Sequence, residues 1–348
     1  MIFRQLFDGT SSTYTYLLAD PETHEAVIID PVFEQQQRDL ALLEELDLKL
    51  KLILDTHVHA DHVTAAWLLK QKTGAVIGCA AVNKAEGVDQ NLKHGDRLKV
   101  GSVELEVRAT PGHTAGCLTY VTADQSMAFT GDAVLIRGCG RSDFQEGNPA
   151  TLYKSVIEQV FSLPDECMIY PAHDYNGRMQ STVGEEKAHN PRLGGQANEQ
   201  DFVRYMDAMR LPHPKKIAEA VPANLRSGRP ESGELPTAPS WAPVRITYAG
   251  VPEVEAQWVA EHRGDLLLLD VREPDEYEDG TGQLPETYRL PLSQLHDRAT
   301  EVPQGKPVVA ICRSGRRSSM AVNILKQQGY DQVANLRGGL LSWQDQGL

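Results

Sequence analysis

The sequence lacks any long hydrophobic run. No stretch of its 348 residues approaches the ~18 apolar residues that a membrane-spanning helix requires. The first 20 residues alternate in polarity like strands and contain no apolar signal core. These absences predict a protein that does not enter a membrane and is located in the cytoplasm.

Cysteine is scarce and irregularly spaced. The five cysteines are Cys79, Cys117, Cys139, Cys167 and Cys312, an odd number without any CxxC pair. A secreted disulfide scaffold depends on paired cysteines, so this pattern favours reduced thiols in a cytosol.

Basic residues are fewer than acidic ones. The 34 lysines and arginines face 48 aspartates and glutamates, which gives a formal net charge of −14. This balance argues against nucleic acid as a general partner. It does not exclude a small anionic substrate, because local arginines can form a positive pocket on an acidic protein.

Short apolar strand patterns alternate with helical patterns along the chain. The expected strands of the first part cover residues 14–19, 26–30, 51–55, 103–109, 117–121, 127–130 and 168–170, and expected helices cover 35–46, 151–163 and 201–210. Paired strands interleaved with helices predict an α/β protein with the sheets at its core.

The composition changes near residue 221. Residues 221–244 are rich in proline and poor in core-forming residues, as in a linker. Strands then alternate with a helix at short intervals: 266–270, 307–312, 318–328 and 333–336. We therefore predict a first domain at 1–220, a linker at 221–244 and a compact parallel α/β domain at 245–348.

Residues 56–62, THVHADH, follow an apolar strand and contain four residues that can bind a metal, His57, His59, Asp61 and His62. Alternate residues of an extended segment point the same way, so the first two histidines can reach one ion. Three further strand ends deliver one ligand type each: His113, Asp132 and His173. Neutral imidazole and carboxylate together suit zinc or iron.

These motifs resemble the metallo-β-lactamase superfamily from the N-terminus to about residue 215. The resemblance implies an N-terminal αββα sandwich and room for up to two metal sites. Residues 131–145, GDAVLIRGCGRSDFQ, resemble the persulfide dioxygenase branch in particular.

That branch implies one Fe(II) per chain, held by His57, His113 and Asp132. Two histidines and a carboxylate leave open positions on iron, which a persulfide sulfur and O2 both need. By the same resemblance His59, Asp61, His62 and His173 do not bind iron but orient its ligands and fix their tautomers.

The implied substrate is glutathione persulfide, whose carboxylates suit arginine. We expect Arg141, Tyr175 and Arg192 to contact it, although each is also compatible with a surface position or a structural salt bridge. Cys139 lies close to this region and is either reactive or a buried, inert thiol. The family also suggests a homodimer.

Cys312 ends an apolar strand, and its loop leads into a helix. Backbone N–H groups, the helix N-terminus and the arginines all favour a thiolate and a bound sulfane sulfur. The expected anion-binding loop consists of Arg313, Ser314, Gly315, Arg316 and Arg317, in which the glycine permits a tight turn.

Residues 266–280, 312–318 and 335–343 together resemble a rhodanese domain, with a parallel α/β fold. The resemblance implies that Cys312 is the sulfur-carrying nucleophile and that Asp270 and Arg272 support its loop. Residues 282–292 depart from the usual small-residue pattern. A phosphatase loop of the Cys-x5-Arg type is disfavoured because Ser318 occupies the arginine position.

Both halves converge on persulfide sulfur. We expect a bifunctional enzyme in which iron oxidises glutathione persulfide with O2 to sulfite and glutathione, while Cys312 transfers sulfur between thiosulfate or sulfite and glutathione. The direction of this transfer stays open. One alternative is a dinuclear zinc hydrolase of glutathione thioesters, of the glyoxalase II type. Another is a C-terminal domain that only carries persulfide or docks a partner.

Overall fold

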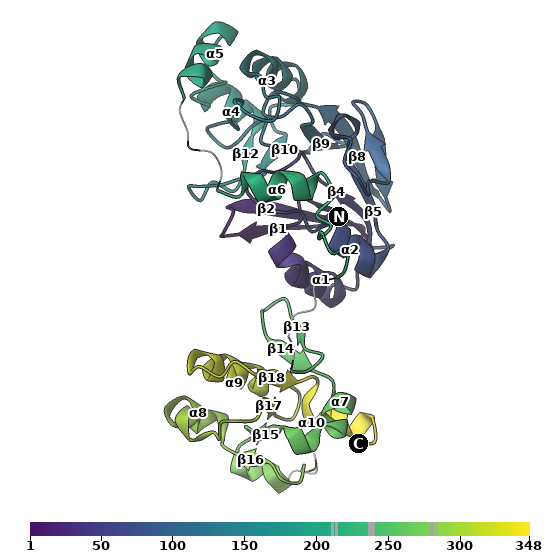
Figure 1. Cartoon of the computed structure of the whole chain (residues 1–348), viewed down its shortest axis with the longest axis vertical. Coiled ribbons are helices and arrows are strands. Elements are labelled where there is room, and N and C mark those ends of the chain that lie inside the picture. The colour runs from purple at the N-terminus through teal and green to yellow at the C-terminus, as the bar shows by residue number, and fades with distance from the viewer. Residues whose placement is uncertain (210–211, 213–214, 236–240, 279–281, 283) are drawn as a thin grey trace. The chain divides into compact units, whose positions relative to one another are not determined.

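The computed structural model describes residues 1–209, 212, 215–235, 241–278, 282 and 284–348. The chain divides into two compact units, Met1–Leu235 and Pro236–Leu348, and each is described by itself (Figure 1). None of the helices in these described ranges is long and apolar enough to cross a membrane.

The first unit contains two six-stranded sheets. The strands of the first sheet lie in chain order: β1 Ile2–Asp8, β2 Thr13–Ala19, β3 Glu25–Ile29, β4 Lys49–Leu54, β5 Val76–Ala80 and β6 Gln90–Leu92. β1 to β3 are antiparallel, whereas β3 to β6 are parallel.

The second sheet has the order β12-β11-β10-β9-β8-β7. Its strands are β7 Arg97–Val100, β8 Val103–Ala109, β9 Leu118–Thr122, β10 Met127–Gly131, β11 Met168–Pro171 and β12 Ser181–Thr182. Only β10 and β11 are parallel, and the other neighbours are antiparallel.

Helices cover the outer face of each sheet. The first sheet packs against α1 Gln36–Glu45 and α2 Ala66–Thr73. The second packs against α3 Pro149–Ser155, its π-helical continuation Val156–Val160, α4 Val183–His189 and α5 Glu199–Ala208. The predicted αββα sandwich is confirmed, with a core of apolar side chains between the sheets.

Strand β2 shows why the sequence forms this sandwich. Tyr14, Tyr16 and Leu18 point into the core between the sheets, and Leu17 and Ala19 point toward the helices. Successive side chains of a strand face opposite sides, so a strand buried on both faces carries apolar side chains on both. The buried hydroxyl of Thr15 in this strand donates to the Asp30 carbonyl at 2.8 Å.

The second unit is one sheet of order β13-β14-β18-β17-β15-β16. The strands are β13 Arg245–Ile246, β14 Pro252–Val254, β15 Leu267–Asp270, β16 Tyr288–Arg289, β17 Val308–Ile311 and β18 Val333–Leu336. All neighbours are parallel except β13 and β14. One face packs against α8 Leu292–Arg298 and α9 Arg316–Gln327, and the other against α7 Ala256–Glu261 and α10 Gly339–Asp345. The predicted parallel α/β domain is confirmed.

The expected linker at 221–244 begins inside a helix, α6 Ile217–Asn224, and the boundary between the two units falls after Leu235. Residues 236–240 of this segment lie outside the described residues, as do residue 210 of the expected helix 201–210 and residue 283 of the segment 282–292.

Candidate metal centre and cysteine loop

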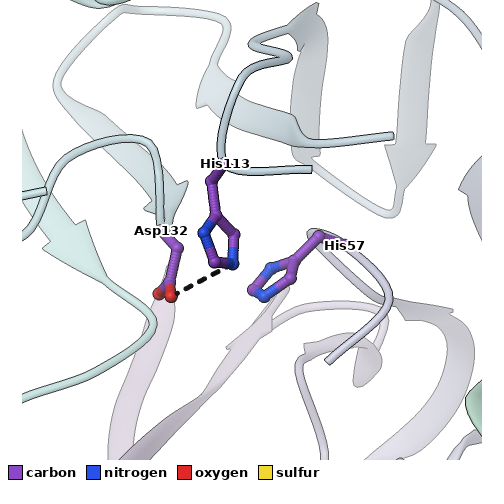
Figure 2. A group of neighbouring side chains, drawn as sticks. All are labelled: His57, His113 and Asp132. Carbon is purple, nitrogen blue, oxygen red and sulfur yellow. Dashed lines mark ion pairs between the residues drawn. The ribbon is translucent and has the colours of Figure 1, made fainter. Parts of the chain in front are cut away.

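Three side chains that are far apart in the sequence meet in the first unit (Figure 2). His57 follows β4, His113 follows β8 and Asp132 follows β10, so each is carried by the end of a strand. One ligand atom from each lies within 4.8 Å of the other two, and His113 Nε2 is 3.5 Å from Asp132 Oδ2. The fold therefore gathers the predicted iron ligands into one group.

Hydrogen bonds hold the two histidines of this group in one tautomer. The Thr56 hydroxyl donates to Asp30 Oδ2 at 2.8 Å and lies 3.0 Å from His57 Nδ1, so it accepts from that ring nitrogen. His113 Nδ1 donates to the backbone carbonyl of Arg141. Both rings therefore direct an unprotonated Nε2 toward an ion, as metal-binding histidines do.

This group fits a metal by its donor chemistry. Asp132 Oδ1 is buried and has no hydrogen-bond partner among the described residues. His173 Nε2 lies 3.7 Å from this oxygen, beyond hydrogen-bond distance. A buried carboxylate oxygen without a hydrogen-bond partner is costly unless a cation neutralises it. Two imidazoles and one carboxylate are the donors that Fe(II) and Zn(II) accept.

A second group lies beside the first. Its members, His59, Asp61 and His173, also offer ligand atoms within 4.8 Å of one another. His59 Nε2 lies 3.1 Å from Asp30 Oδ1, while its Nδ1 has no hydrogen-bond partner among the described residues. The geometry thus provides donors for a second ion, and the supporting role expected for these residues stays a prediction.

His62 lies beside the second group, with its ring 4.3 Å from that of His59. Its Nδ1 is 3.1 Å from Asp61 Oδ2 and 3.3 Å from the Thr13 hydroxyl. Its Nε2 has no hydrogen-bond partner in the described part of the chain. His62 therefore orients Asp61 and retains one free nitrogen.

Burial controls protonation at this centre. It holds the pKa of His57 and of His59 well below the usual value, and neighbouring imidazoles lower both further. Burial also lowers the pKa of His173, but Asp132 and Asp61 outweigh it and leave that pKa raised. The rings of His57 and His59 are therefore neutral near pH 7, the form in which imidazole binds metals.

The metal group lies in a cleft of about 320 Å³. The three predicted substrate contacts, Arg141, Tyr175 and Arg192, line this same cleft. Tyr175 is 67% exposed, and its ring stacks on that of His173 at 6.0 Å. A cleft of this size is at the lower end of the range for small-molecule sites.

Both predicted arginines are already engaged. Arg141 donates from Nε and Nη2 to the Asp143 carboxylate, each at 2.6 Å, and from Nη1 to the Pro212 carbonyl. Arg192 donates to the Cys139 carbonyl at 2.9 Å. The structure thus gives both arginines the structural contacts that the sequence left as an alternative to substrate binding.

Cys139 is buried in the wall of the cleft. Burial raises the pKa of its thiol to about 11, against a weaker opposing effect of Arg192. The thiolate is therefore rare near pH 7, which favours the inert alternative over a reactive cysteine.

Asn224 was missed by sequence reasoning. It ends α6, in the segment expected to be linker, and its buried side chain holds the metal-binding loop. Its Nδ2 donates to the carbonyls of His59 and His62 at 2.9 and 2.8 Å, and its Oδ1 accepts from Thr64 N at 2.8 Å. A lone asparagine 160 residues away carries no local signal of this role.

Cys312 follows β17 in the second unit, and Gly315 turns the chain at φ +87° before α9 begins. The sulfur accepts from Gly315 N at 3.2 Å, from Ser318 N at 3.5 Å and from the Ser318 hydroxyl at 3.2 Å. Donors therefore surround the buried sulfur, as an anionic sulfur requires. The sequence pattern distinguishes Ser318 only by its place where a phosphatase has arginine, and its role as a donor is visible only in the structure.

The remaining residues of this loop divide into two kinds. Arg313, Ser314 and Arg316 are exposed, whereas Arg317 forms an ion pair with Glu276. Arg272 is fully buried, donates to Asp270 Oδ2 at 2.8 Å and also donates to the Glu276 carbonyl at 3.1 Å. Asp270 and Arg272 thus reach the cysteine loop through Glu276, in line with a supporting role.

Comparison with known proteins separates the two units. The Metallo-beta-lactamase superfamily profile matches residues 8–173, and the Rhodanese-like domain profile matches residues 255–346. The protein "Persulfide dioxygenase ETHE1, mitochondrial" from Bos taurus is 52% identical over 231 residues, which is 66% of this chain and 89% of that protein. A hydroxyacylglutathione hydrolase from Brucella ovis is 36% identical over 62% of this chain and 83% of its own length. The crystal structure of ETHE1 from Myxococcus xanthus has a TM-score of 0.64 at 50% identity, covering 66% of this chain and all of the other.

Proposed function

Because this chain belongs to the persulfide dioxygenase family of the metallo-β-lactamase superfamily and carries a rhodanese-like domain, we propose that it is a bifunctional enzyme of sulfane sulfur. The first unit oxidises glutathione persulfide, and the second transfers sulfur through Cys312. The observation that carries the proposal is the buried group of His57, His113 and Asp132 in the cleft of a chain from this family.

The proposed oxidation consumes glutathione persulfide, O2 and water, and produces glutathione, sulfite and two protons. The terminal sulfur is oxidised and O2 is reduced, so no further oxidant is needed. One Fe(II) per chain, held by His57, His113 and Asp132, would supply open positions at which the persulfide sulfur and O2 are brought together and activated.

The chain's own residues contribute binding and orientation. The Arg141 carbonyl and the Thr56 hydroxyl fix the rings of His113 and His57, so that each keeps an unprotonated nitrogen. Burial limits water at the group, while Tyr175 is exposed on the cleft and available to the substrate. The hydrogen bonds to the two histidines orient the metal ligands, and Tyr175 contacts the substrate. None of these groups takes part in bond breaking.

The proposed sulfur transfer has two steps. The Cys312 thiolate attacks the outer sulfur of thiosulfate, forms a cysteine persulfide and releases sulfite. Glutathione thiolate then takes the outer sulfur, which yields glutathione persulfide and restores Cys312. The N–H groups of Gly315 and Ser318 stabilise sulfur anions in both steps. The reverse direction combines sulfite with glutathione persulfide to give thiosulfate.

A second candidate for the first unit is a dinuclear hydrolase of glutathione thioesters. The donor atoms of His59, Asp61 and His173 favour it, because they offer a second ion a place beside the first. The lower identity to the hydroxyacylglutathione hydrolase weighs against it.

Metal content and O2 uptake separate the two candidates. We expect protein purified without oxygen to hold close to one iron per chain and to consume O2 when glutathione persulfide is added. The His113→Ala variant should lose both. Two zinc ions per chain, no O2 uptake and cleavage of a glutathione thioester would overturn the dioxygenase proposal.

We further propose that the protein works in a reducing, cytoplasmic compartment. All five cysteines are buried and free, so neither unit depends on a disulfide. A shift in migration between reducing and non-reducing gels after isolation with a thiol-blocking reagent would contradict this.

A further inference from the structure

The mouth of the metal-binding cleft carries an arginine that sequence reasoning did not select. Arg178 lines the cleft together with His57, His113 and Asp132. It also lines a neighbouring hollow, and the two share Ile136, Arg137 and Arg178. A substrate whose sulfur lies at the metal group can therefore extend toward this side chain.

Four arginines line the cleft, and three of them are committed to other groups. Arg141 is held by the Asp143 carboxylate, and Arg192 by the Cys139 carbonyl. Arg137 forms ion pairs with Glu185 and Glu186. The charges of Arg137 and Arg141 are therefore paired with carboxylates within the protein, whereas Arg192 is held by a neutral carbonyl and lies over the Tyr205 ring.

Arg178 differs from these three. Its guanidinium has no hydrogen bond and no ion pair to any residue of the described ranges, and the side chain is exposed. The nearby carboxylate of Glu185 is occupied by Arg137 and by the Ser181 hydroxyl at 3.2 Å. All five N–H donors of the fork thus remain available to a ligand.

The backbone that carries Arg178 is held in place on both sides. Asp174 accepts from the Tyr14 hydroxyl at 2.9 Å and from Asn176 N at 2.7 Å, which closes a turn at the start of the loop. Gly177 completes the turn at φ +74°. Beyond the arginine, Gln5 Nε2 donates to the Met179 carbonyl at 2.8 Å. The unpaired guanidinium therefore projects from an anchored loop.

We propose that Arg178 binds a carboxylate of the thiol that carries the persulfide. This inference rests on the function proposed above and adds to it a residue that selects the carrier. A guanidinium binds a carboxylate through two parallel hydrogen bonds, and glutathione offers two carboxylates, one on its glycine and one on its γ-glutamyl residue. A persulfide whose carrier thiol has no carboxylate offers no such partner.

Steady-state O2 uptake by the full chain tests the proposal. Arg178→Gln should lower kcat/KM for glutathione persulfide by about tenfold, mainly through a higher KM. Arg178→Lys should recover part of the loss, since it keeps the charge but not the fork. The matched control is Arg97→Gln, which removes the same charge from exposed β7 outside the cleft and should leave kcat/KM unchanged.

The choice of substrate identifies the carboxylate. The persulfide of 2-mercaptoethanol has none, so Arg178→Gln should match the unmodified chain with it. Persulfides of γ-glutamylcysteinylglycinamide and of cysteinylglycine each lack one of the two carboxylates of glutathione, and the one that becomes insensitive to Arg178→Gln lacks the carboxylate that Arg178 binds. An equal loss with all four substrates, or no loss with glutathione persulfide, overturns the proposal.

Binding of glutathione itself provides a readout that does not depend on turnover. Titration calorimetry should give a Kd about tenfold weaker for Arg178→Gln than for Arg97→Gln. If none of the persulfides supports O2 uptake by the unmodified chain, the proposed function fails. The titration with glutathione still tests whether Arg178 binds a carboxylate. Equal Kd values for the two variants would refute the role of Arg178.

Discussion

The two candidate sites differ in the sequence separation between the residues that form them. The metal group draws His57, His113 and Asp132 from the ends of three strands in two sheets. The sulfur of Cys312 receives its donors from Gly315 in the following loop and from Ser318 in the first turn of α9. A site of the first kind depends on the fold of a whole unit, whereas a site of the second kind depends on one turn and its supports.

The largest test of this comparison asks whether the two chemistries are separable. Cys312→Ser should reduce sulfur transfer from thiosulfate to glutathione by at least about 10³-fold, because a hydroxyl cannot carry sulfur. O2 uptake with glutathione persulfide should stay within about twofold of the unmodified chain. Sulfite release from thiosulfate and glutathione in the absence of O2 measures sulfur transfer, and an oxygen electrode measures persulfide oxidation in the same preparation.

His113→Ala is the reciprocal variant, since it should abolish iron binding and O2 uptake while sparing sulfur transfer. Loss of O2 uptake in Cys312→Ser would mean that the sites are coupled. Intact sulfur transfer in that variant would reduce the second unit to a docking module.

A substitution in the buried ion pair of Asp270 and Arg272 should destabilise the unit that carries the cysteine loop. Arg272→Met leaves Asp270 as a buried charge without its partner and should destabilise the second unit by about 3–5 kcal/mol. We expect sulfur transfer to be lost at a lower urea concentration than O2 uptake.

Arg298→Met is the matched control, because Arg298 lies on α8 of the same unit and pairs with Glu301 at the surface. Its sulfur-transfer midpoint in urea should not move. Equal midpoints for Arg272→Met and Arg298→Met would show that the buried pair does not support the loop.

A substitution at Asn224 tests whether the metal group depends on residues that are far away in the sequence. Asn224→Ala removes three hydrogen bonds and leaves buried loop groups unpaired, so the first unit should lose about 2–4 kcal/mol. Iron occupancy should fall as the loop of His59 and His62 loosens, which metal analysis after dialysis measures. The control Asn91→Ala changes an exposed asparagine of β6 in the same unit and should retain its iron.

The smallest expected effect concerns pH and lies away from both sites. Burial raises the pKa of Asp39 to about 6, although Arg38 opposes the rise, and Asp39 Oδ2 has no hydrogen-bond partner in the described residues. The folded state therefore favours the protonated acid. The protonated Asp39 side chain contributes fully to the free energy of unfolding below its unfolded pKa near 4. This contribution decreases as the pH rises from about 4 to about 6 and is absent at higher pH.

Asp39→Asn mimics the protonated acid and should hold the stability of the first unit nearly constant across this window. Relative to the unmodified chain it should gain at most about 3 kcal/mol at pH 7 and nothing at pH 4. Urea unfolding at several pH values measures the difference, with the exposed Asp47→Asn as control. A gain that does not vary with pH would contradict the assigned cause.

The fold was predictable from the sequence because its signals are local. Apolar runs such as residues 51–55 and 168–170 correspond to β4 and β11, and the cysteine loop lies between β17 and α9 as expected. The end of the first unit was less predictable. Its α6 carries an internal proline, Pro222, which reads as a helix breaker in the sequence. The burial of Asn224 against the metal-binding loop depends on contacts 160 or more residues away.

The sequence by itself determined which chemical groups are present: seven histidines and aspartates that can bind a metal, in motifs at strand ends, and one cysteine before a glycine-containing turn. Residue spacing alone did not decide how they are grouped: the family resemblance implied the group of His57, His113 and Asp132, and the tertiary structure brought those side chains together. It placed His57 with His113 and Asp132, and placed His59 with Asp61 and His173, although the motif gives His57 and His59 equal standing. It also left the Arg178 guanidinium without a partner among the described residues while engaging Arg141 and Arg192. The reason is physical: covalent neighbours set which donors occur, but packing of two sheets sets which donors face the same space and which charges are already satisfied.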